Sequence, residues 1–230
     1  MISLALLGKD IAHSKSQKIY TELLSQDFNY TKYDIADIDD IPTLDEIFST
    51  ASGLSITSPY KRHFLSKVSM TEEIKNLNAI NCIKKKSDNT FEGTNTDYLA
   101  LKDIFVKLID HYKLQNFVIL GAGSMSHVTQ ILAKELKIEF QVLSRNNNDD
   151  LENIKLESSN KGCRTMIINA CSRHFIHRGL FDSGIIFLDY NYNFRPHLEH
   201  FIELQDRYID GIGLLKSQAE YALKFWQISN

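Results

Sequence analysis

The sequence predicts an α/β fold, because short apolar runs alternate with helical patterns along most of its 230 residues. Each run is apolar at consecutive positions, which is typical of a strand buried on both faces of a parallel sheet. Between the runs, apolar residues recur at intervals of three and four, as in helices that pack one face on a sheet. The predicted strands are residues 2–7, 54–57, 117–120, 166–168 and 185–188.

A second α/β unit is expected to follow the first. A helical pattern over about residues 97–112 leads into a new strand at Phe117. Alternation of this kind builds α/β domains. The chain shows no glycine- or serine-rich linker, so the boundary is placed from the pattern alone.

Composition and charge argue against several classes of protein. The formal net charge of −3 gives no electrostatic reason to expect a nucleic acid or an anionic membrane as partner. The apolar start of the chain has no basic leader and no cleavage site, so it is interpreted as a strand and not as a signal peptide. No apolar stretch approaches the roughly 20 residues of a membrane span. Cys82, Cys163 and Cys171 are widely spaced, which indicates neither disulfides nor a metal site and favours a cytoplasmic protein.

A glycine turn follows the predicted strand 117–120 and precedes a helical pattern, the order typical of dinucleotide sites. Gly121 permits the tight turn, Gly123 lets the backbone approach a pyrophosphate, and the helix start supplies free N–H groups. Ser126 stands where glycine or alanine usually allows close helix packing. The turn is either structural or a dinucleotide site, and its context favours the second, with contacts from Gly121, Ala122, Gly123, Ser124 and Met125.

Arg145 lies at the end of the next predicted strand, about 20 positions after the glycines. An acidic residue at that place would bind the adenosine ribose, whereas an arginine suits a 2′-phosphate. We therefore expect NADP, with NAD as the alternative. Asp149 and Asp150 follow shortly and would repel a phosphate that they faced. The other interpretation of Arg145 is a solvated surface side chain.

Three polar residues lie near predicted strand ends in the first unit. Ser14 and Ser16 stand at a helix entry, where hydroxyls either cap the helix or bind a carboxylate. Lys61 follows the strand 54–57, and Pro59 suits a first helical turn. Lys61 is therefore expected at the sheet edge where α/β folds bind ligands. It is either a solvated lysine or an acid–base group tuned by burial and charge.

Three further polar residues have both a structural and a functional interpretation. Asp97 either complements the dipole of the helix that it begins or takes part in a site. Asn81 interrupts an apolar run and therefore needs partners, in the protein or on a ligand. Gln218 lies on the margin of the apolar face of the last helical pattern, where a ligand contact would explain it.

Taken in order, these segments resemble the shikimate dehydrogenase family along nearly the whole chain. The family's serine pair and its Asn-Val-Thr-x-Pro-x-Lys, Gly-Ala-Val-Asn and Asn-Thr-Asp segments are similar to residues 14–16, 55–61, 78–81 and 95–97. Its Asn-Arg-Thr, Asn-Ala-Thr-Ser and Asp-x-x-Tyr segments, and the segment that returns to the substrate domain, are similar to residues 144–146, 169–172, 189–192 and 210–218.

The resemblance implies a substrate-binding α/β domain at residues 1–100, completed by a C-terminal helix at 208–230, and a Rossmann-type NADP-binding domain at 101–207. It implies that Lys61 and Asp97 are the catalytic pair. The implied substrate contacts are Ser14, Ser16, Thr57, Asn81, Tyr192 and Gln218. The implied cofactor contacts are those of the glycine turn together with Arg145, Asn169 and Gly213.

The implied reaction is the reversible reduction of 3-dehydroshikimate to shikimate by NADPH, a step in the biosynthesis of chorismate and the aromatic amino acids. Lys61 would donate a proton to the developing alkoxide, with Asp97 orienting it. The implied protein is a cytoplasmic monomer or homodimer. The alternatives are a relative that acts on quinate and a non-catalytic paralogue that only binds a dinucleotide or metabolite.

Overall fold

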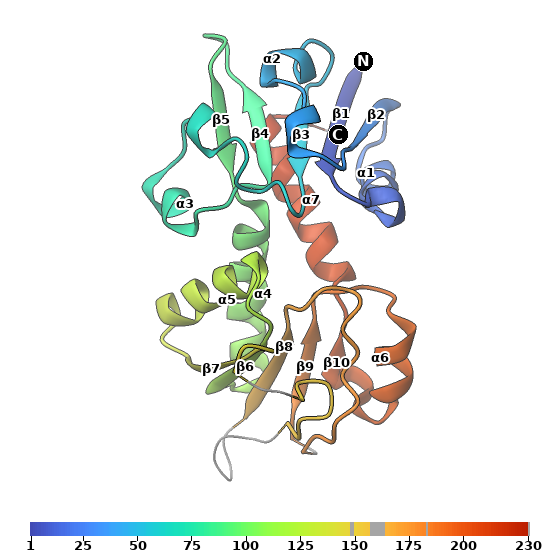
Figure 1. The fold of residues 1–230 in the computed structure, drawn as a ribbon, viewed down its shortest axis with the longest axis vertical. Helices are drawn as coiled ribbons and strands as arrows, with labels where there is room; N and C mark the ends of the chain where they lie inside the picture. The colour runs from blue at the N-terminus through green and yellow to red at the C-terminus, as the bar shows by residue number, and fades with distance from the viewer. Residues whose placement is uncertain (148–149, 157–163, 183, 230) are drawn as a thin grey trace. The chain divides into compact units, whose positions relative to one another are not determined.

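The computed structural model describes residues 1–147, 150–156, 164–182 and 184–229. The chain divides into two compact units, one made of Met1–Ala100 with Leu215–Asn230 and the other of Leu101–Leu214. Each unit has its own five-stranded sheet, accompanied by helices, so the predicted α/β fold class is confirmed (Figure 1). None of the described helices combines the length and the apolarity needed to cross a membrane.

The sheet of the first unit is mixed. Its strands are β1 (Ile2–Gly8), β2 (Phe28–Asp34), β3 (Gly53–Ile56), β4 (Cys82–Lys85) and β5 (Phe91–Thr94), in the order β2-β1-β3-β4-β5. β1 runs parallel to β2 and β3, whereas β4 runs antiparallel to β3 and β5. The expectation of a parallel sheet therefore holds for only part of this unit. The short turn between β4 and β5 leaves no room for the crossover that parallel pairing needs.

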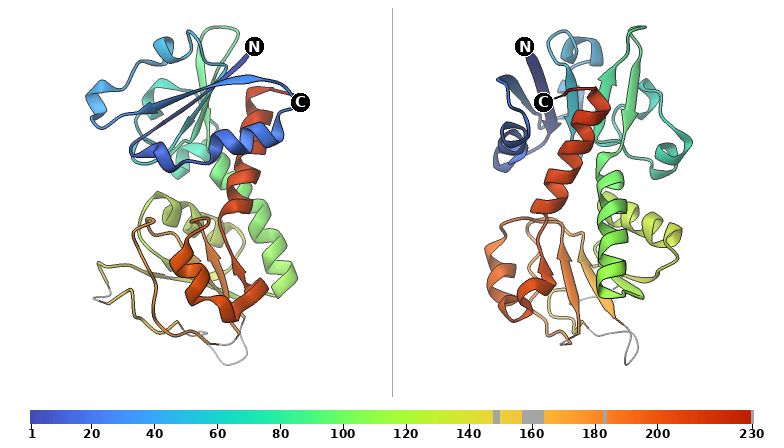
Figure 2. Two further views of the ribbon diagram at one scale, coloured as in Figure 1. Left: turned by 90° about the vertical axis from the view of Figure 1, so that its right-hand side faces the viewer. Right: turned by 180° about the vertical axis from the view of Figure 1, so that it is seen from behind.

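The first unit contains α1 (Ser16–Leu23), α2 (Leu44–Ile47), α3 (Glu72–Leu77), the start of α4 (Thr96–Tyr112) and the end of α7 (Ile212–Trp226). Thr43 and Thr71 begin α2 and α3 by accepting a hydrogen bond from the backbone N–H three residues on. α7 lies along the sheet (Figure 2) and shares an apolar cluster with α1 and the sheet. The buried members of that cluster are Leu4, Ile19, Tyr20, Leu24, Cys82, Ala219, Ala222, Leu223 and Trp226.

The sheet of the second unit is parallel throughout. Its strands are β6 (Asn116–Leu120), β7 (Glu139–Leu143), β8 (Thr165–Asn169), β9 (Ile186–Asp189) and β10 (Tyr208–Ile209), in the order β10-β9-β8-β6-β7. Every residue of β6, β8 and β9 is buried, as the continuous apolar runs predict. The unit also holds most of α4, α5 (Ser124–Glu135) and α6 (Arg195–His200). Short 3-10 helices across the chain are η1 (Ile11–His13), η2 (Ile38–Asp40), η3 (Leu65–Lys67) and η4 (Ile202–Arg207).

Two local expectations differ from the structure. The helical turn expected at Pro59 is absent from this described stretch. Instead, Tyr60 N–H donates to the carbonyl of Thr57, and His63 N–H donates to the carbonyl of Tyr60. This three-residue spacing is typical of consecutive tight turns. The Ser58–Pro59 peptide is cis. In addition, residues 208–209 pair with β9 as β10, so the last helix begins only at Ile212.

Candidate functional site

Lys61 and Asp97 form an ion pair in the first unit. Lys61 Nζ lies 2.7 Å from Asp97 Oδ2, and the two side chains are only 10% and 14% exposed. Ile80 N–H donates to the carbonyl of Lys61 at 2.9 Å, which fixes the turn that carries the lysine. A charged pair with so little solvent contact can hold an ammonium group ready to exchange a proton with a bound molecule.

The N-terminus of α4 is held by Asn95, one residue before the helix. Its Oδ1 accepts from Tyr98 N–H at 3.0 Å, and its Nδ2 donates to the carbonyl of Ala79 at 2.9 Å. The first bond is a helix cap and the second ties the helix start to the segment before β4. Asn95 therefore sets the position of Asp97, a role that the sequence interpretation does not assign. An asparagine directly before a helical pattern is the feature that could have predicted it.

Asn81 and Gln218 meet at Thr96, which is fully buried. Thr96 N–H donates to Asn81 Oδ1 at 2.7 Å, and Thr96 Oγ1 lies 3.2 Å from that oxygen and 3.1 Å from Gln218 Oε1. Gln218 Nε2 donates to the carbonyl of Leu215. The oxygen of Asn81 is thus a structural tie, while its Nδ2 has no acceptor in the part of the chain that the structure describes. Thr96 is another residue that the sequence interpretation does not assign.

Ser14, Ser16 and Thr57 lie beside the carboxyl ends of β1 and β3. These strands are parallel neighbours that pair Leu7 with Ile56, so the segments that follow them start at the same edge of the sheet. Ser14 Oγ lies 3.1 Å from Ser16 Oγ and accepts from Ser16 N–H at 3.3 Å. The residue at the cap position of α1 is Lys15, which makes no side-chain cap, so the capping interpretation of the two serines is not realised in its usual form. Both hydroxyls lie at the N-terminus of α1, where a carboxylate can bind.

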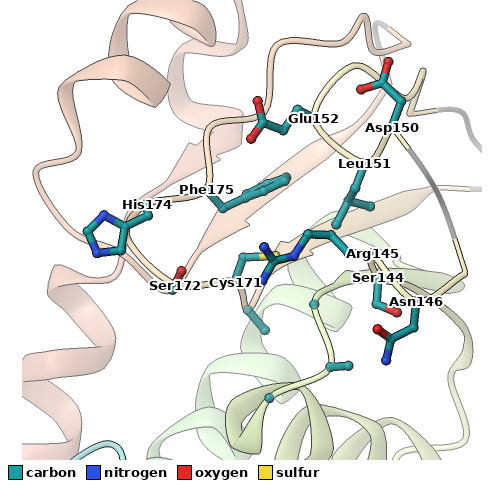
Figure 3. Close-up of a pocket in the computed structure, with 14 residues that line it drawn as sticks. Ser144, Arg145, Asn146, Asp150, Leu151, Glu152, Cys171, Ser172, His174 and Phe175 are labelled. Carbon is teal, nitrogen blue, oxygen red and sulfur yellow. The ribbon is translucent and has the colours of Figure 1, made fainter.

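The second unit contains a pocket of about 540 Å³ at the carboxyl ends of β6, β7 and β8 (Figure 3). This edge of a parallel sheet is where doubly wound folds bind their ligands. Figure 3 shows the Arg145 side chain extending across the pocket toward Cys171. The lining residues are Gly121, Ala122, Gly123, Ser144, Arg145, Asn146, Asp150, Leu151, Glu152, Ala170, Cys171, Ser172, His174 and Phe175.

The glycine turn has the geometry that its sequence predicts. Gly121 has φ +104°, and a Cβ at this position would lie 3.0 Å from Cys171 Sγ. Gly123 caps α5, and nothing lies within 4 Å of a Cβ built on it, so the helix N-terminus opens into free space. Ser126 is fully buried and accepts from Gln130 Nε2 at 3.2 Å, which satisfies the hydroxyl that replaces glycine or alanine. Ser124 and Met125 lie in the first turn of α5, outside the lining residues.

The charges around the pocket have both signs. Exposed Arg145 shares the lining with Asp150 and Glu152, while Asp149 lies outside the described residues. Cys171 is half-buried, and burial raises the pKa of its thiol to about 11, with Arg145 opposing that rise and Asp189 adding to it. The thiol is therefore protonated at neutral pH and presents a polarisable, uncharged surface to the pocket.

Three predicted contacts lie away from these lining residues. Asn169 is fully buried, donates from Nδ2 to Asp189 Oδ1 at 3.0 Å, and accepts at Oδ1 from Cys171 N–H at 3.1 Å. It therefore reaches the pocket only through the backbone of Cys171. Tyr192 is half-buried, and its carbonyl accepts from the guanidinium of Arg173 at 3.4 Å. Gly213 is exposed in the first turn of α7.

The fold and these two groups of residues define a two-unit α/β protein, whose second unit has the doubly wound sheet and glycine turn typical of dinucleotide-binding folds. Residues 6–83 match the family described as the shikimate dehydrogenase substrate binding domain. A shikimate dehydrogenase (NADP(+)) of Buchnera aphidicola subsp. Schizaphis graminum is 28% identical, over 96% of this chain and 90% of its own length. The chain is therefore similar to curated shikimate dehydrogenases along nearly its whole length, and its first part matches their substrate binding domain.

Solved structures show the same fold. A shikimate dehydrogenase from Peptoclostridium difficile aligns with 100% of this chain and 93% of its own, with a TM-score of 0.74 and 23% identity. A shikimate 5-dehydrogenase from Thermus thermophilus, in complex with NADP(H) and shikimate, aligns with 98% of this chain and 93% of its own, with a TM-score of 0.68 and 19% identity.

Proposed function

We propose that this protein catalyses the reversible reduction of 3-dehydroshikimate to shikimate with NADPH, the activity named for its relatives. The observation that carries the proposal is the Lys61–Asp97 ion pair, which a protein that only binds a metabolite does not need. The pair lies in the first unit, most of which matches the family's substrate-binding domain. We assign the substrate contacts other than Tyr192 to this unit, and cofactor binding to the second.

The pocket of the second unit fits an NADP cofactor. Gly121 and Gly123 open the N-terminus of α5 to a pyrophosphate, and Arg145 offers a positive charge to a 2′-phosphate. Ala122 lines the same turn, while we expect Ser124 and Met125 to contribute backbone N–H groups from the first turn of the helix. When bound, NADPH supplies the hydride that reduces the C3 carbonyl of the substrate.

The chain's own residues handle the proton and hold the substrate. As the carbonyl carbon gains a hydride, Lys61 donates a proton to the oxygen and becomes a neutral amine, and Asp97 keeps the ammonium form oriented beforehand. Ser14 and Ser16 are assigned to the substrate carboxylate. Asn81 offers its free Nδ2 to a substrate hydroxyl. The other proposed substrate contacts are Thr57, Tyr192 and Gln218, and the other proposed cofactor contacts are Asn169, acting through Cys171, and Gly213.

A turnover assay tests this function. Purified protein is incubated with shikimate or quinate and with NADP or NAD, and the absorbance of the reduced nicotinamide is followed. We expect turnover with shikimate and NADP to exceed that of every other combination. A quinate rate above the shikimate rate would assign the protein to the quinate-acting relatives, and no turnover by folded protein would contradict an enzymatic role.

The variant Lys61→Ala tests the ion pair. General acid–base groups typically contribute about 10²–10⁴-fold to rate, so kcat should fall within that range. Lys84→Ala is the matched control, because Lys84 also forms an ion pair on the first sheet, 3.2 Å from Glu92, and has no assigned role. A Lys61→Ala rate within a few-fold of the Lys84→Ala rate would remove Lys61 from the mechanism.

A further inference from the structure

Asp189 is a fully buried carboxylate at the carboxyl end of β9, next to the pocket of the second unit but not among its lining residues. Its Oδ1 accepts from Asn169 Nδ2 at 3.0 Å and from the backbone and side-chain nitrogens of Asn191 at 2.9 and 3.1 Å. Its Oδ2 accepts from Tyr208 OH at 3.0 Å and lies 2.6 Å from His197 Nδ1. So many partners are what a buried carboxylate requires.

The neighbouring bonds determine the protonation of His197, which is also fully buried. His177 N–H donates to His197 Nε2 at 2.9 Å, so that nitrogen must carry a lone pair. The single proton of the neutral ring is then on Nδ1, where it is donated to Asp189 Oδ2. His197 therefore links the Asp189 carboxylate to the backbone of His177 through two hydrogen bonds.

These bonds reach both ends of one wall of the pocket, which we call the wall segment and define as residues 170–177. Near its start, Asn169 Oδ1 accepts from Cys171 N–H at 3.1 Å. At its end, His197 accepts from His177 N–H. Between them, Phe175 N–H closes a turn on the carbonyl of Ser172. Figure 3 shows this segment carrying four labelled lining residues, Cys171, Ser172, His174 and Phe175.

We propose that Asp189 and His197 are positioning residues that hold the wall segment at both ends and thereby shape the cofactor pocket. This inference rests on the proposed function for the identity of the cofactor, but the clamp itself does not depend on it. A network that served stability alone would connect anywhere in the core. Besides its bonds to Asn191 and Tyr208, this network connects to the two backbone N–H groups that bound the wall.

Three variants separate the two ends of the clamp. His197→Leu removes the link to His177, and Asn169→Ala removes the acceptor for Cys171 N–H. His197→Gln is the conservative variant, since its amide keeps one donor and one acceptor side by side. His200→Leu is the matched control, because His200 lies on the same helix and its described hydrogen bond is with the carbonyl of Gly179, outside the wall segment. Its ring lies beside that of His177, with the centroids 6.0 Å apart, so the control also shows what the loss of a neighbouring imidazole does to the wall segment.

Backbone hydrogen exchange of the full chain, measured without cofactor, tests the clamp directly. His197→Leu should accelerate exchange at His177, and Asn169→Ala should accelerate it at Cys171. His197→Gln and His200→Leu should leave both amides close to the wild-type rate. Exchange rates that stay unchanged in both His197→Leu and Asn169→Ala would overturn the proposal. If His197→Leu does not fold, the Asn169→Ala result decides by itself.

Kinetics then test the link to the pocket. We expect His197→Leu to raise KM for NADP about tenfold while KM for shikimate stays within about twofold, and His197→Gln to restore the NADP value. Equal loss for both substrates, or no rescue by His197→Gln, would reduce the pair to a purely structural role and overturn the proposal. A wild-type protein that neither binds NADPH nor turns over shikimate would instead contradict the proposed function, and the exchange result would still stand.

Discussion

One methyl group added at Gly53 should displace the indole of Trp226. A Cβ built on Gly53 lies 2.4, 2.5 and 2.8 Å from the ring atoms Cδ2, Cε2 and Cγ of Trp226. Carbon atoms pack at about 3.5 Å, so the indole must retreat by about 1 Å in Gly53→Ala. Trp226 Nε1 donates to the carbonyl of Ile83 at 2.9 Å, and a retreat of that size breaks this bond.

The expected loss combines two effects. Overpacking of a core typically costs about 1–3 kcal/mol, and a lost hydrogen bond costs about 1 kcal/mol more. We therefore expect the free energy of unfolding to fall by about 2–4 kcal/mol, a large share of the roughly 5–15 kcal/mol that holds a domain folded.

Trp226 provides its own probe, because it is the only tryptophan in the chain and is 7% exposed. Urea unfolding followed by tryptophan fluorescence should show a lower midpoint for Gly53→Ala. Gly184→Ala is the control, since nothing lies within 4 Å of a Cβ at that position. In the Trp226→Leu background, followed by circular dichroism, Gly53→Ala should cost less, because the clash is gone. A Gly53→Ala midpoint equal to that of Gly184→Ala, or full additivity in the double variant, would refute the reasoning.

Three further outcomes are expected in the second unit. Gly121→Ala should weaken NADPH binding about tenfold, because φ +104° disfavours a side chain by about 1–2 kcal/mol. The affinity is measured by titration of NADPH fluorescence, and an unchanged affinity would contradict this prediction. Iodoacetamide should label Cys171 slowly at pH 7 and faster as the pH approaches 11, because burial raises the pKa of its thiol to about 11. Peptide mass spectrometry measures the labelling, and rapid labelling at pH 7 would contradict this prediction. Burial lowers the pKa of His177 from 6.5 to about 4, so the unfolded chain binds a proton first as the pH falls. Stability should then be full above pH 6.5 and decline by up to about 3 kcal/mol toward pH 4, and His177→Phe should flatten this decline in urea titrations.

The apolar runs predicted the strands whose two faces are both covered. β1, β3, β6, β8 and β9 all appear within a residue or two of the expected ranges. β2 escapes this criterion, because it is an edge strand whose residues are all exposed or half-buried. β5 escapes it because its residues, Phe-Glu-Gly-Thr at 91–94, do not form an apolar run.

The candidate site could be predicted where a reactive residue type stands in a recognisable motif. The motif order placed Lys61 and Asp97 in the site, but their 2.7 Å separation depends on backbone turns that no periodicity encodes. The hydrogen-bond network of Asp189 could not be predicted from the sequence, for a different reason. Its members His177, His197 and Tyr208 are ordinary polar residues in the sequence. Only folding brings His197 and Tyr208 to one carboxylate and places His177 N–H against His197.

The return of the chain to its first unit has a consequence for the order of folding. Leu4 and Tyr20 share a cluster with Trp226, although the whole second unit lies between them in the sequence. During synthesis the first sheet and α1 are made early, yet the apolar cluster that they share stays incomplete until α7 follows. Contacts across such a long loop close late, because chain entropy must be lost before burial compensates for it. The unit that begins the protein is therefore expected to be the last to reach its native packing.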